Sequence, residues 1–446
     1  MNESQKIPEV SFLKFLNHAG SILKNPLPFH EKNFNKLGDI FRLKIGFGKS
    51  VLFCRDAILL NHVLQKNQKN YTKSSIQTKD VAKYVGKGLL TAEGEVWQKQ
   101  RKLIQPAFHK SQLMLLLDTI QNTISAELEN IQTDRPIDIF PVFNDLAFQT
   151  VVKSIFNIEM EAKDVKALQH TTEATQSMLV QELRQPFLVW WFELSGKTKR
   201  HLDMTDNSRA ILRRLVAERI QSKDRRDDLL DMLLDAKYED GSTMEESQLI
   251  DEILILFAAG HETTSNALTF CTELLARHPA VQNKIFEEVR NIKQETNNLM
   301  ERIKMASYTK QVIEEAMRLY PPAYFIDRVN KENDECNGVF LPKGSNLLFS
   351  VYEIHRHKDF WVDPTAFKPE RFAKENALKL SKHYYPFGAG PRMCIGNNFA
   401  MYEMILAILS LVEKYEIVEK KSPIEIKPLI TLKPKNAILE FKLRYE

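Results

Sequence analysis

The stretch FGAGPRMCIG, residues 387–396, decides how the rest of this chain is interpreted. It places Cys394 among three glycines, a proline and an arginine. Directly after it, apolar residues recur at the three- and four-residue spacing of one helix face: Met401, Met404, Ile405, Ile408 and Leu409. We therefore expect Cys394 where a glycine-rich turn leads into a helix N-terminus. Unsatisfied N–H groups and the helix dipole stabilise a thiolate there.

The residues around this cysteine suit a flat, negatively charged partner. Glycines adopt backbone shapes that other residues resist, and they let a bulky group approach closely. Arg392, two residues before the cysteine, would bind a carboxylate. These features favour a thiolate-ligated haem. A small buried cysteine beside an ordinary turn is the alternative that they leave open.

The complete pattern F-G-x-G-x-R-x-C-x-G resembles the haem-binding signature of the cytochrome P450 family. The resemblance implies that Cys394 is the axial ligand of the iron in haem b. It also implies that Arg392 binds a haem propionate and that Phe387 packs beside the sulfur and tunes its redox potential. Gly396 completes the same loop.

Length, charge and cysteine spacing exclude several classes of protein. The chain has 446 residues, 43% of them hydrophobic, and a net charge of +4, which does not indicate general nucleic-acid binding. The cysteines are far apart and form no CxxC pair, so a zinc finger and a disulfide framework are not indicated: Cys54, Cys271, Cys336 and Cys394. The N-terminus lacks a signal-peptide core, and no stretch reaches the ~18 apolar residues of a membrane span. We expect a cytoplasmic protein without a membrane anchor. Residues 12–23 are expected to be an ordinary entry segment packed on the body, with a short amphipathic helix as the alternative.

Residues 84–108 hold a second group of candidate haem contacts. Trp97 and Arg101 are four residues apart and share one face of a helix that is expected to start after Gly94. By themselves they would be a core aromatic and a solvated charge. W-x-x-x-R followed by P-A-F resembles the C-helix of the family, which implies that both side chains donate to a propionate. Residues 71–85 would then help to cover the substrate.

A long apolar helix is predicted over residues 249–275, preceded by a possible capping box of Thr243 and Glu246. Its middle reads AAGHETT, residues 258–264, although a glycine and consecutive threonines are locally unfavourable in a helix. A kink with a solvated Glu-Thr pair is the plainer interpretation. The string resembles the oxygen-binding helix of the family, which implies that small residues line the oxygen site and that an acid–alcohol pair carries protons. The implied residues are Ala259, Gly260, Glu262 and Thr263.

Residues 311–328 predict a helix that ends near Pro321-Pro322. Glu315 and Arg318 are three residues apart on it, a spacing that on a surface contributes only about 0.2–0.5 kcal/mol. E-x-x-R-L-Y-P-P resembles the K-helix of the family, where this pair is buried and stabilises the fold. Within F-x-P-E-R-F, Arg371 would complete the ion triad.

The same resemblance assigns residues that follow this helix. Arg328 would be a further propionate ligand. A strand with pocket-facing side chains is expected over Ala323, Tyr324, Phe325 and Ile326, with core packing as the alternative. His355 has no second ligand at metal spacing, so we assign no metal to it.

Other segments carry little chemistry in the sequence. Residues 36–55 predict a β-hairpin in a small surface sheet. The aromatic run LVWWF, residues 188–192, is predicted to pack in the core, with a lid over a substrate pocket as the alternative. The charged run KDRRDD, residues 223–228, is predicted to be a solvated connection. Lys99 and Lys102 are either solvated or part of a basic surface for a redox partner.

The motifs occur in family order and cover most of the chain. We therefore expect one mainly α domain with a small β portion over residues 1–446, the cytochrome P450 fold, as a monomer without a fused reductase. It would insert one atom of O₂ into a C–H bond of a small organic substrate, by hydroxylation or O-dealkylation. Electrons would come from NAD(P)H through a ferredoxin or flavodoxin and its reductase. A peroxygenase and a non-catalytic haem gas sensor or carrier are the alternatives, and a fatty acid, a terpenoid and a methoxylated polar compound are the substrate classes left open.

Overall fold

The computed structural model describes residues 7–46, 48–158, 160–419 and 424–444. Helix accounts for 62% and strand for 13%, which confirms the predicted mainly helical fold with a small β portion. The chain forms two compact units. The first comprises Met1–Ser74, Lys310–Ile395 and Ile424–Asn436, and the second comprises Ser75–Thr309, Gly396–Pro423 and Ala437–Glu446.

The first unit contains a six-stranded sheet in the order β1-β2-β3-β9-β6-β4. The strands come from three separate parts of the chain: β1 (Glu9–Val10), β2 (Ile40–Gly46), β3 (Lys49–Cys54), β4 (Tyr71–Thr72), β6 (Phe325–Asn330) and β9 (Asn346–Ser350). β2 and β3 pair antiparallel, from Ile40 opposite Cys54 to Gly46 opposite Lys49, so the predicted hairpin is confirmed. Phe47 of its turn lies outside the described residues. The hairpin is not a separate surface sheet, because β3 continues in parallel into β9.

Helices and two short hairpins complete the first unit. The helical segments are α1 (Phe12–Lys24), α2 (Leu27–Leu37), α3 (Ala57–Asn61), the π-helix η1 (His62–Lys66), the 3-10 helix η2 (Gln68–Asn70), most of α16 (Ser307–Leu319), α17 (Val351–Ile354), the 3-10 helices η6 (Pro369–Phe372) and η7 (Lys374–Asn376), α18 (Ala377–Leu380) and the 3-10 helix η8 (Gly390–Arg392). The hairpins are β7 (Asp334–Cys336) with β8 (Val339–Leu341), and β11 (Glu425–Pro428) with β12 (Leu432–Lys435). Residues 12–24 form the helix α1, which was the alternative for this entry segment; it is capped by Ser11 and lies against β2.

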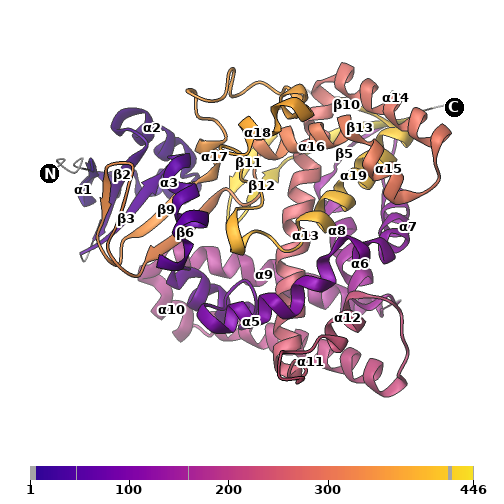
Figure 1. Ribbon diagram of the computed structural model, residues 1–446, viewed down its shortest axis with the longest axis horizontal. Helices are drawn as coiled ribbons and strands as arrows, with labels where there is room; N and C mark the ends of the chain where they lie inside the picture. The colour runs from indigo at the N-terminus through magenta and orange to yellow at the C-terminus, as the bar shows by residue number, and fades with distance from the viewer. Residues whose placement is uncertain (1–6, 47, 159, 420–423, 445–446) are drawn as a thin grey trace. The chain divides into compact units, whose positions relative to one another are not determined.

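The second unit is built around α13 (Glu246–Arg277), which packs against α8 (Phe140–Phe156) and α19 (Asn397–Lys414) (Figure 1). Most side chains of α13 are buried, as expected for a helix that is apolar around most of its circumference. Its other α-helices are α4 (Ala82–Val85), α5 (Gly94–Ile104), α6 (Lys110–Leu115), α7 (Leu117–Leu128), α9 (Ala162–Arg184), α10 (Val189–Leu194), α11 (Lys197–Ser222), α12 (Leu229–Asp235), α14 (Pro279–Glu295) and α15 (Leu299–Met305). The π-helix η3 (Ile76–Val81) and the 3-10 helices η4 (Gln105–Phe108) and η5 (Pro186–Leu188) are shorter turns of the same unit. A three-stranded sheet has the order β10 (Tyr415–Glu419), β13 (Ile438–Leu443), β5 (Pro136–Asp138).

The start of α13 differs from the sequence prediction. The helix begins at Glu246 with Glu245 as its N-cap residue, and no side chain caps it. Thr243 instead forms an isolated β-bridge with Lys237. The predicted capping box is therefore wrong, because the backbone of Thr243 is extended rather than positioned at the helix end.

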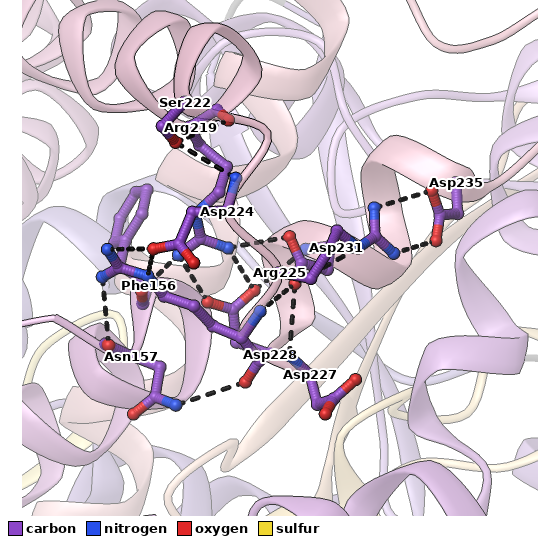
Figure 2. A network of polar contacts seen from close by, with 11 residues as sticks. Phe156, Asn157, Arg219, Ser222, Asp224, Arg225, Asp227, Asp228, Asp231 and Asp235 are labelled. Carbon is purple, nitrogen blue, oxygen red and sulfur yellow. Dashed lines mark hydrogen bonds and ion pairs between the residues drawn. The ribbon is translucent and has the colours of Figure 1, made fainter.

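The charged run 223–228 is only partly solvated, which corrects its interpretation as a simple surface connection. Asp228 is fully buried and caps α12, and its Oδ2 lies 2.7 Å from Nη2 of the buried Arg219. Arg219 also donates to Asp231 Oδ1 at 2.8 Å and to the carbonyl oxygen of Phe156 at 2.6 Å (Figure 2). Burial opposes the charge of Arg219, but its bonds to the two aspartates outweigh this effect and raise its pKa. The run thus joins α11 to α12 through a buried ionic network.

Candidate functional site

The loop that carries Cys394 is a tight turn stabilised by its own backbone. Gly388 and Gly390 have φ angles of 71° and 70°, which favour glycine. The Cys394 N–H donates to the carbonyl oxygen of Phe387 at 3.0 Å. A Cβ on Gly390 would lie 1.9 Å from the carbonyl oxygen of Leu64, so no side chain fits there. Helix α19 begins at Asn397, three residues after the cysteine, and Gly396 is its N-cap residue.

Exposure separates Cys394 from the other three thiols. Cys54 and Cys271 are buried, Cys336 is half-buried, and Cys394 is exposed. Burial raises the pKa of Cys271 to about 12, and it also raises the pKa values of Cys54 and Cys336. These three thiols are therefore held protonated near neutral pH, whereas only a thiolate is a good metal ligand.

The remaining candidates of the first unit lie on the cysteine loop and on β6. Arg392 ends the 3-10 turn η8 and is half-buried. Arg328 is buried on β6, and its Nη1 donates to the carbonyl oxygen of Asp327 at 2.7 Å. Ile326, also on β6, comes within 4.0 Å of the position that a Cβ of Gly388 would take. The structure therefore brings Ile326 next to the cysteine loop.

The other pocket candidates differ in their surroundings. Ala323 is exposed and precedes β6. Tyr324 is buried, and its hydroxyl donates to the carbonyl oxygen of Leu429 at 2.7 Å. Phe325 is half-buried, and its ring centroid lies 5.2 Å from the ring of His30 and 6.4 Å from that of Phe53. Tyr324 and Phe325 thus have packing partners within the first unit.

The predicted ion triad residues are in contact. Glu315 and Arg318 are fully buried, with Nε 2.7 Å from Oε2 and Nη2 2.8 Å from Oε1. Arg371 Nε lies 3.3 Å from the same carboxylate, and the N–H of Lys368 donates to it at 2.9 Å. Arg318 also donates to the carbonyl oxygens of three further residues: His355, Pro364 and Ala366. The hydrogen bonds that a buried charged group requires are therefore present.

His355 has a structural environment. It is fully buried, and its Nε2 lies 2.8 Å from the backbone nitrogen of Tyr385. Burial lowers its pKa well below the usual range, so the ring is neutral and accepts this hydrogen bond. Within the part of the chain that the structure describes, no group of three or more metal-ligating side chains is found.

In the second unit, Trp97 and Arg101 lie on α5, as predicted, although the helix begins at Gly94 itself rather than after it. Trp97 is buried, whereas Arg101 is half-buried and donates from Nε to Gln105 Oε1 at 3.0 Å. Lys99 is exposed, and Lys102 forms an ion pair with Glu239. Part of the predicted basic surface is therefore neutralised by an acidic neighbour.

In the middle of α13, one threonine hydroxyl bonds back to the preceding helical turn. Thr263 Oγ1 donates to the carbonyl oxygen of Ala259 at 2.8 Å. Glu262 is buried, so the alternative of a solvated Glu-Thr pair is wrong. A Cβ on Gly260 would lie 3.0 Å from Val151 of α8, which explains a small residue at the helix contact. The side-chain amide of Gln176 on α9 lies 3.4 Å from the carbonyl oxygen of Ala258, a contact that no sequence pattern indicated.

Two acidic residues of α13 hold the segment that leads into α5. Asp251 accepts from the N–H of Lys87 at 2.8 Å, and Glu252 accepts from the N–H of Leu89 at 2.9 Å. A Cβ on Gly86 would lie 2.1 Å from the Asp251 carboxylate, so the close approach requires glycine. Sequence reasoning missed both acids, because in the sequence they are only polar interruptions near the start of an apolar helix.

Comparison with known proteins identifies the family. The cytochrome P450 family matches residues 6–441, so the chain belongs to this family. Pentalenene oxygenase of Streptomyces avermitilis is 28% identical over 409 residues, 90% of this chain and 89% of the relative. Cyclooctat-9-en-7-ol 5-monooxygenase of Streptomyces melanosporofaciens is 26% identical over 408 residues, 90% of this chain and 87% of the relative. Cytochrome P450 3A6 of Oryctolagus cuniculus is 27% identical over 380 residues, 80% of this chain and 75% of the relative.

The protein is thus a cytochrome P450 monooxygenase, a haem-thiolate enzyme that requires O₂ and a redox partner. This excludes the alternative of a non-catalytic haem carrier. The residues present fit the cofactor, because Cys394 offers an exposed soft ligand on a loop whose glycine leaves no room for a side chain. Within the described residues, no helix is both long enough and apolar enough to cross a membrane.

Proposed function

We propose that this protein hydroxylates or O-dealkylates a small organic substrate at a C–H bond, with Cys394 as the thiolate ligand of haem b. The proposal rests on the exposed Cys394 thiol in its glycine-shaped loop, inside a chain that matches the family along nearly its whole length. When bound, haem b would supply the activation of O₂ and the transfer of one oxygen atom, while the second atom leaves as water.

The surrounding residues would bind the propionate groups of the haem, tune the thiolate and supply protons for the reaction. Four side chains carry only hydrogen-bond donors, which suits carboxylates of the propionate type: Trp97, Arg101, Arg328 and Arg392. Phe387 accepts the N–H of Cys394 through its carbonyl oxygen and would thereby keep the thiolate in place.

Ala259 and Gly260 would leave room for O₂ beside α13, since both side chains are small. Thr263 would pass protons from the buried Glu262 through water, because its hydroxyl sits in the helix groove on the carbonyl of Ala259.

We propose an apolar substrate, with a terpenoid as the first class to test. Two relatives are named for the oxidation of pentalenene and of cyclooctat-9-en-7-ol. The partly buried side chains of Phe325 and Ile326 would add apolar surface to such a site. Spectral titration with terpenoids, fatty acids and methoxylated polar compounds distinguishes the classes, and tight displacement of the iron-bound water only by the polar compounds would contradict this choice.

Replacement of the cysteine tests the central assignment. Cys394→Ala is expected to abolish the thiolate-type Soret band of the reduced protein with CO. The matched control is Cys336→Ala, which removes another thiol that is not fully buried and should leave the band unchanged. A thiolate-type band that survives in Cys394→Ala would falsify the assignment.

A second experiment tests the proton path. Thr263→Ala should release more H₂O₂ per NAD(P)H consumed than the wild-type protein, with a ferredoxin or flavodoxin and its reductase as the electron source. Unchanged coupling would exclude the relay. Product formed with H₂O₂, but none with O₂ and any electron donor, would favour the peroxygenase alternative.

A further inference from the structure

A single turn of π-helix, η1, lies beside the cysteine loop in the first unit. It follows directly on α3, and its backbone bond spans five residues, from the N–H of Asn67 to the carbonyl oxygen of His62 at 2.8 Å. Turns of this kind are rare and occur frequently at functional sites. No residue of the site proposed above lies on η1, although it packs against η8 of the cysteine loop. A rare turn in contact with the ligand loop requires a physical explanation.

The contact between η1 and the cysteine loop is close. The carbonyl oxygen of Leu64, in the middle of η1, lies 1.9 Å from the position that a Cβ of Gly390 would take. Leu64 also belongs to the same buried apolar cluster as Tyr385 and Ala389, which precede Cys394 in the chain. Because protein interiors are close-packed, a shift of Leu64 has to be accommodated by the backbone of the loop.

One carboxylate holds both ends of this π-turn. Asp334 on β7 follows His62 by 272 residues, and its Oδ2 accepts from His62 Nε2 at 2.9 Å. The same oxygen accepts from Asn67 Nδ2 at 3.0 Å, and His62 and Asn67 are the two residues that the π-helical backbone bond joins. The hydroxyl of Tyr71, which is buried on β4, donates to Oδ2 at 2.5 Å. Oδ1 accepts from the N–H of Glu335 at 2.9 Å.

The protonation states of these groups strengthen the clamp. The side chain of Asp334 is only 11% exposed, and burial opposes its charge, but the bonds from Tyr71, His62 and Asn67 outweigh this effect and lower its pKa. Burial raises the pKa of Tyr71, so its hydroxyl keeps the proton that it donates. Hydrogen bonds to an ionised acceptor are about twice as strong as neutral ones. The two ends of η1 are therefore held more firmly than in an ordinary surface turn.

We propose that Asp334 is a positioning residue for the thiolate, because through η1 it fixes the backbone of the loop that carries Cys394. Without the carboxylate, the ends of η1 are released and Leu64 withdraws from Gly390. The bond from the Cys394 N–H to the carbonyl oxygen of Phe387 then opens more often. The expected effect on the haem rests on the proposed role of Cys394 as iron ligand, whereas the effect on the loop backbone does not.

Hydrogen exchange of the whole chain measures the loop directly. Asp334→Asn removes the charge and keeps the shape of the side chain. Exchange of the amide hydrogens of residues 388–394 should become at least about tenfold faster than in the wild-type protein, because losing a bond to a charged acceptor shifts a local opening equilibrium by this factor or more. In the haem-loaded protein, the half-life of the thiolate-type reduced-CO band should shorten by a similar factor.

Three further variants separate positioning from general stability. Glu335→Gln changes an exposed carboxylate on the same hairpin and should behave like the wild-type protein. Tyr71→Phe removes a donor outside η1, so it should lower the denaturation midpoint but leave loop exchange and the band unchanged. Asn67→Ala releases one end of η1 and should accelerate loop exchange as Asp334→Asn does. It supplies the same test if Asp334→Asn does not fold.

Two results would overturn the proposal. The first is loop exchange in Asp334→Asn and in Asn67→Ala at the wild-type rate. The second is an acceleration in Tyr71→Phe as large as that in Asp334→Asn, which would make the carboxylate a general stabiliser of the sheet. A wild-type protein without any thiolate-type band would instead contradict the role of Cys394, and loop exchange would still decide the role of Asp334.

Discussion

A carboxyl group buried in the second unit should make the stability of this protein depend on pH. Glu403 lies on α19, nine residues after Cys394, and its side chain is fully buried. Among the described groups, none meets hydrogen-bond geometry with either carboxylate oxygen. Burial raises the pKa of Glu403 from 4.5 to about 8, and the nearby Thr150 hydroxyl opposes part of this rise. The folded protein therefore keeps the group protonated at neutral pH.

The sign and the size of the effect follow from proton linkage. Because the folded state binds the proton more tightly, the stabilisation is fully present below pH 4.5 and is lost as the pH rises through about 8. The two pKa values differ by about 3.5, and each pKa unit corresponds to about 1.4 kcal/mol, which sets an upper bound of about 5 kcal/mol. Glu403→Gln keeps the shape of the side chain and replaces the titrating carboxyl group by an amide that does not titrate. Relative to the wild-type protein, its free energy of unfolding should thus rise by about 4 kcal/mol between pH 5 and pH 8.

Chemical denaturation of the haem-loaded protein at several pH values measures this difference. Each wild-type unfolding curve is compared with that of Glu403→Gln at the same pH, so that all other titrating groups cancel. Glu375→Gln, which changes an exposed carboxyl group, is the control and should show no such trend. A difference between wild type and Glu403→Gln that stays constant from pH 5 to pH 8 would refute the reasoning.

Three further predictions concern stability and the cysteine loop. Glu315→Ala leaves a buried arginine without its carboxylate and should cost about 3–5 kcal/mol in denaturation, whereas Glu332→Ala at an exposed ion pair should cost less than about 1 kcal/mol. In Gly390→Ala the new methyl group would collide with the backbone carbonyl of Leu64, so this variant should lose the thiolate-type reduced-CO band. Gly388 has a similar φ, but a methyl group there would have no neighbouring atom closer than 4.0 Å. Gly388→Ala should therefore keep the band, at a cost in stability of about 1–2 kcal/mol. Arg219→Met leaves the fully buried Asp228 without its cation and Asp231 with only the more distant Arg225 at 3.7 Å, and its denaturation midpoint should fall by an amount that corresponds to about 3–5 kcal/mol.

The end of α16 and the start of α5, to within one residue, could be predicted from the sequence, as could the local hydroxyl bond of α13, because these features arise from neighbours in the chain; the start of α13 could not. Gly94 begins α5, the residues before Pro321 end α16, and Thr263 bonds back to Ala259 within one helical turn. Side-chain spacing and missing N–H groups decide such features whatever packs around them. The glycine-rich motif around Cys394 likewise predicts the turn that leads into α19.

Tertiary structure alone decided which polar and apolar groups are buried. Sequence reasoning placed Trp190 in the core and Asp228 in solvent, and the structure reverses both. Glu403 lies on a helix whose apolar pattern predicts a single buried face. Its side chain does not belong to that pattern, yet it is fully buried as well. Burial depends on which element covers a side chain, and that element is often distant in the chain, as β3 and β9 are. The chain sequence therefore determines the glycine-shaped turn that carries Cys394, while long-range packing determines the pKa of Glu403 and the exposure of Trp190.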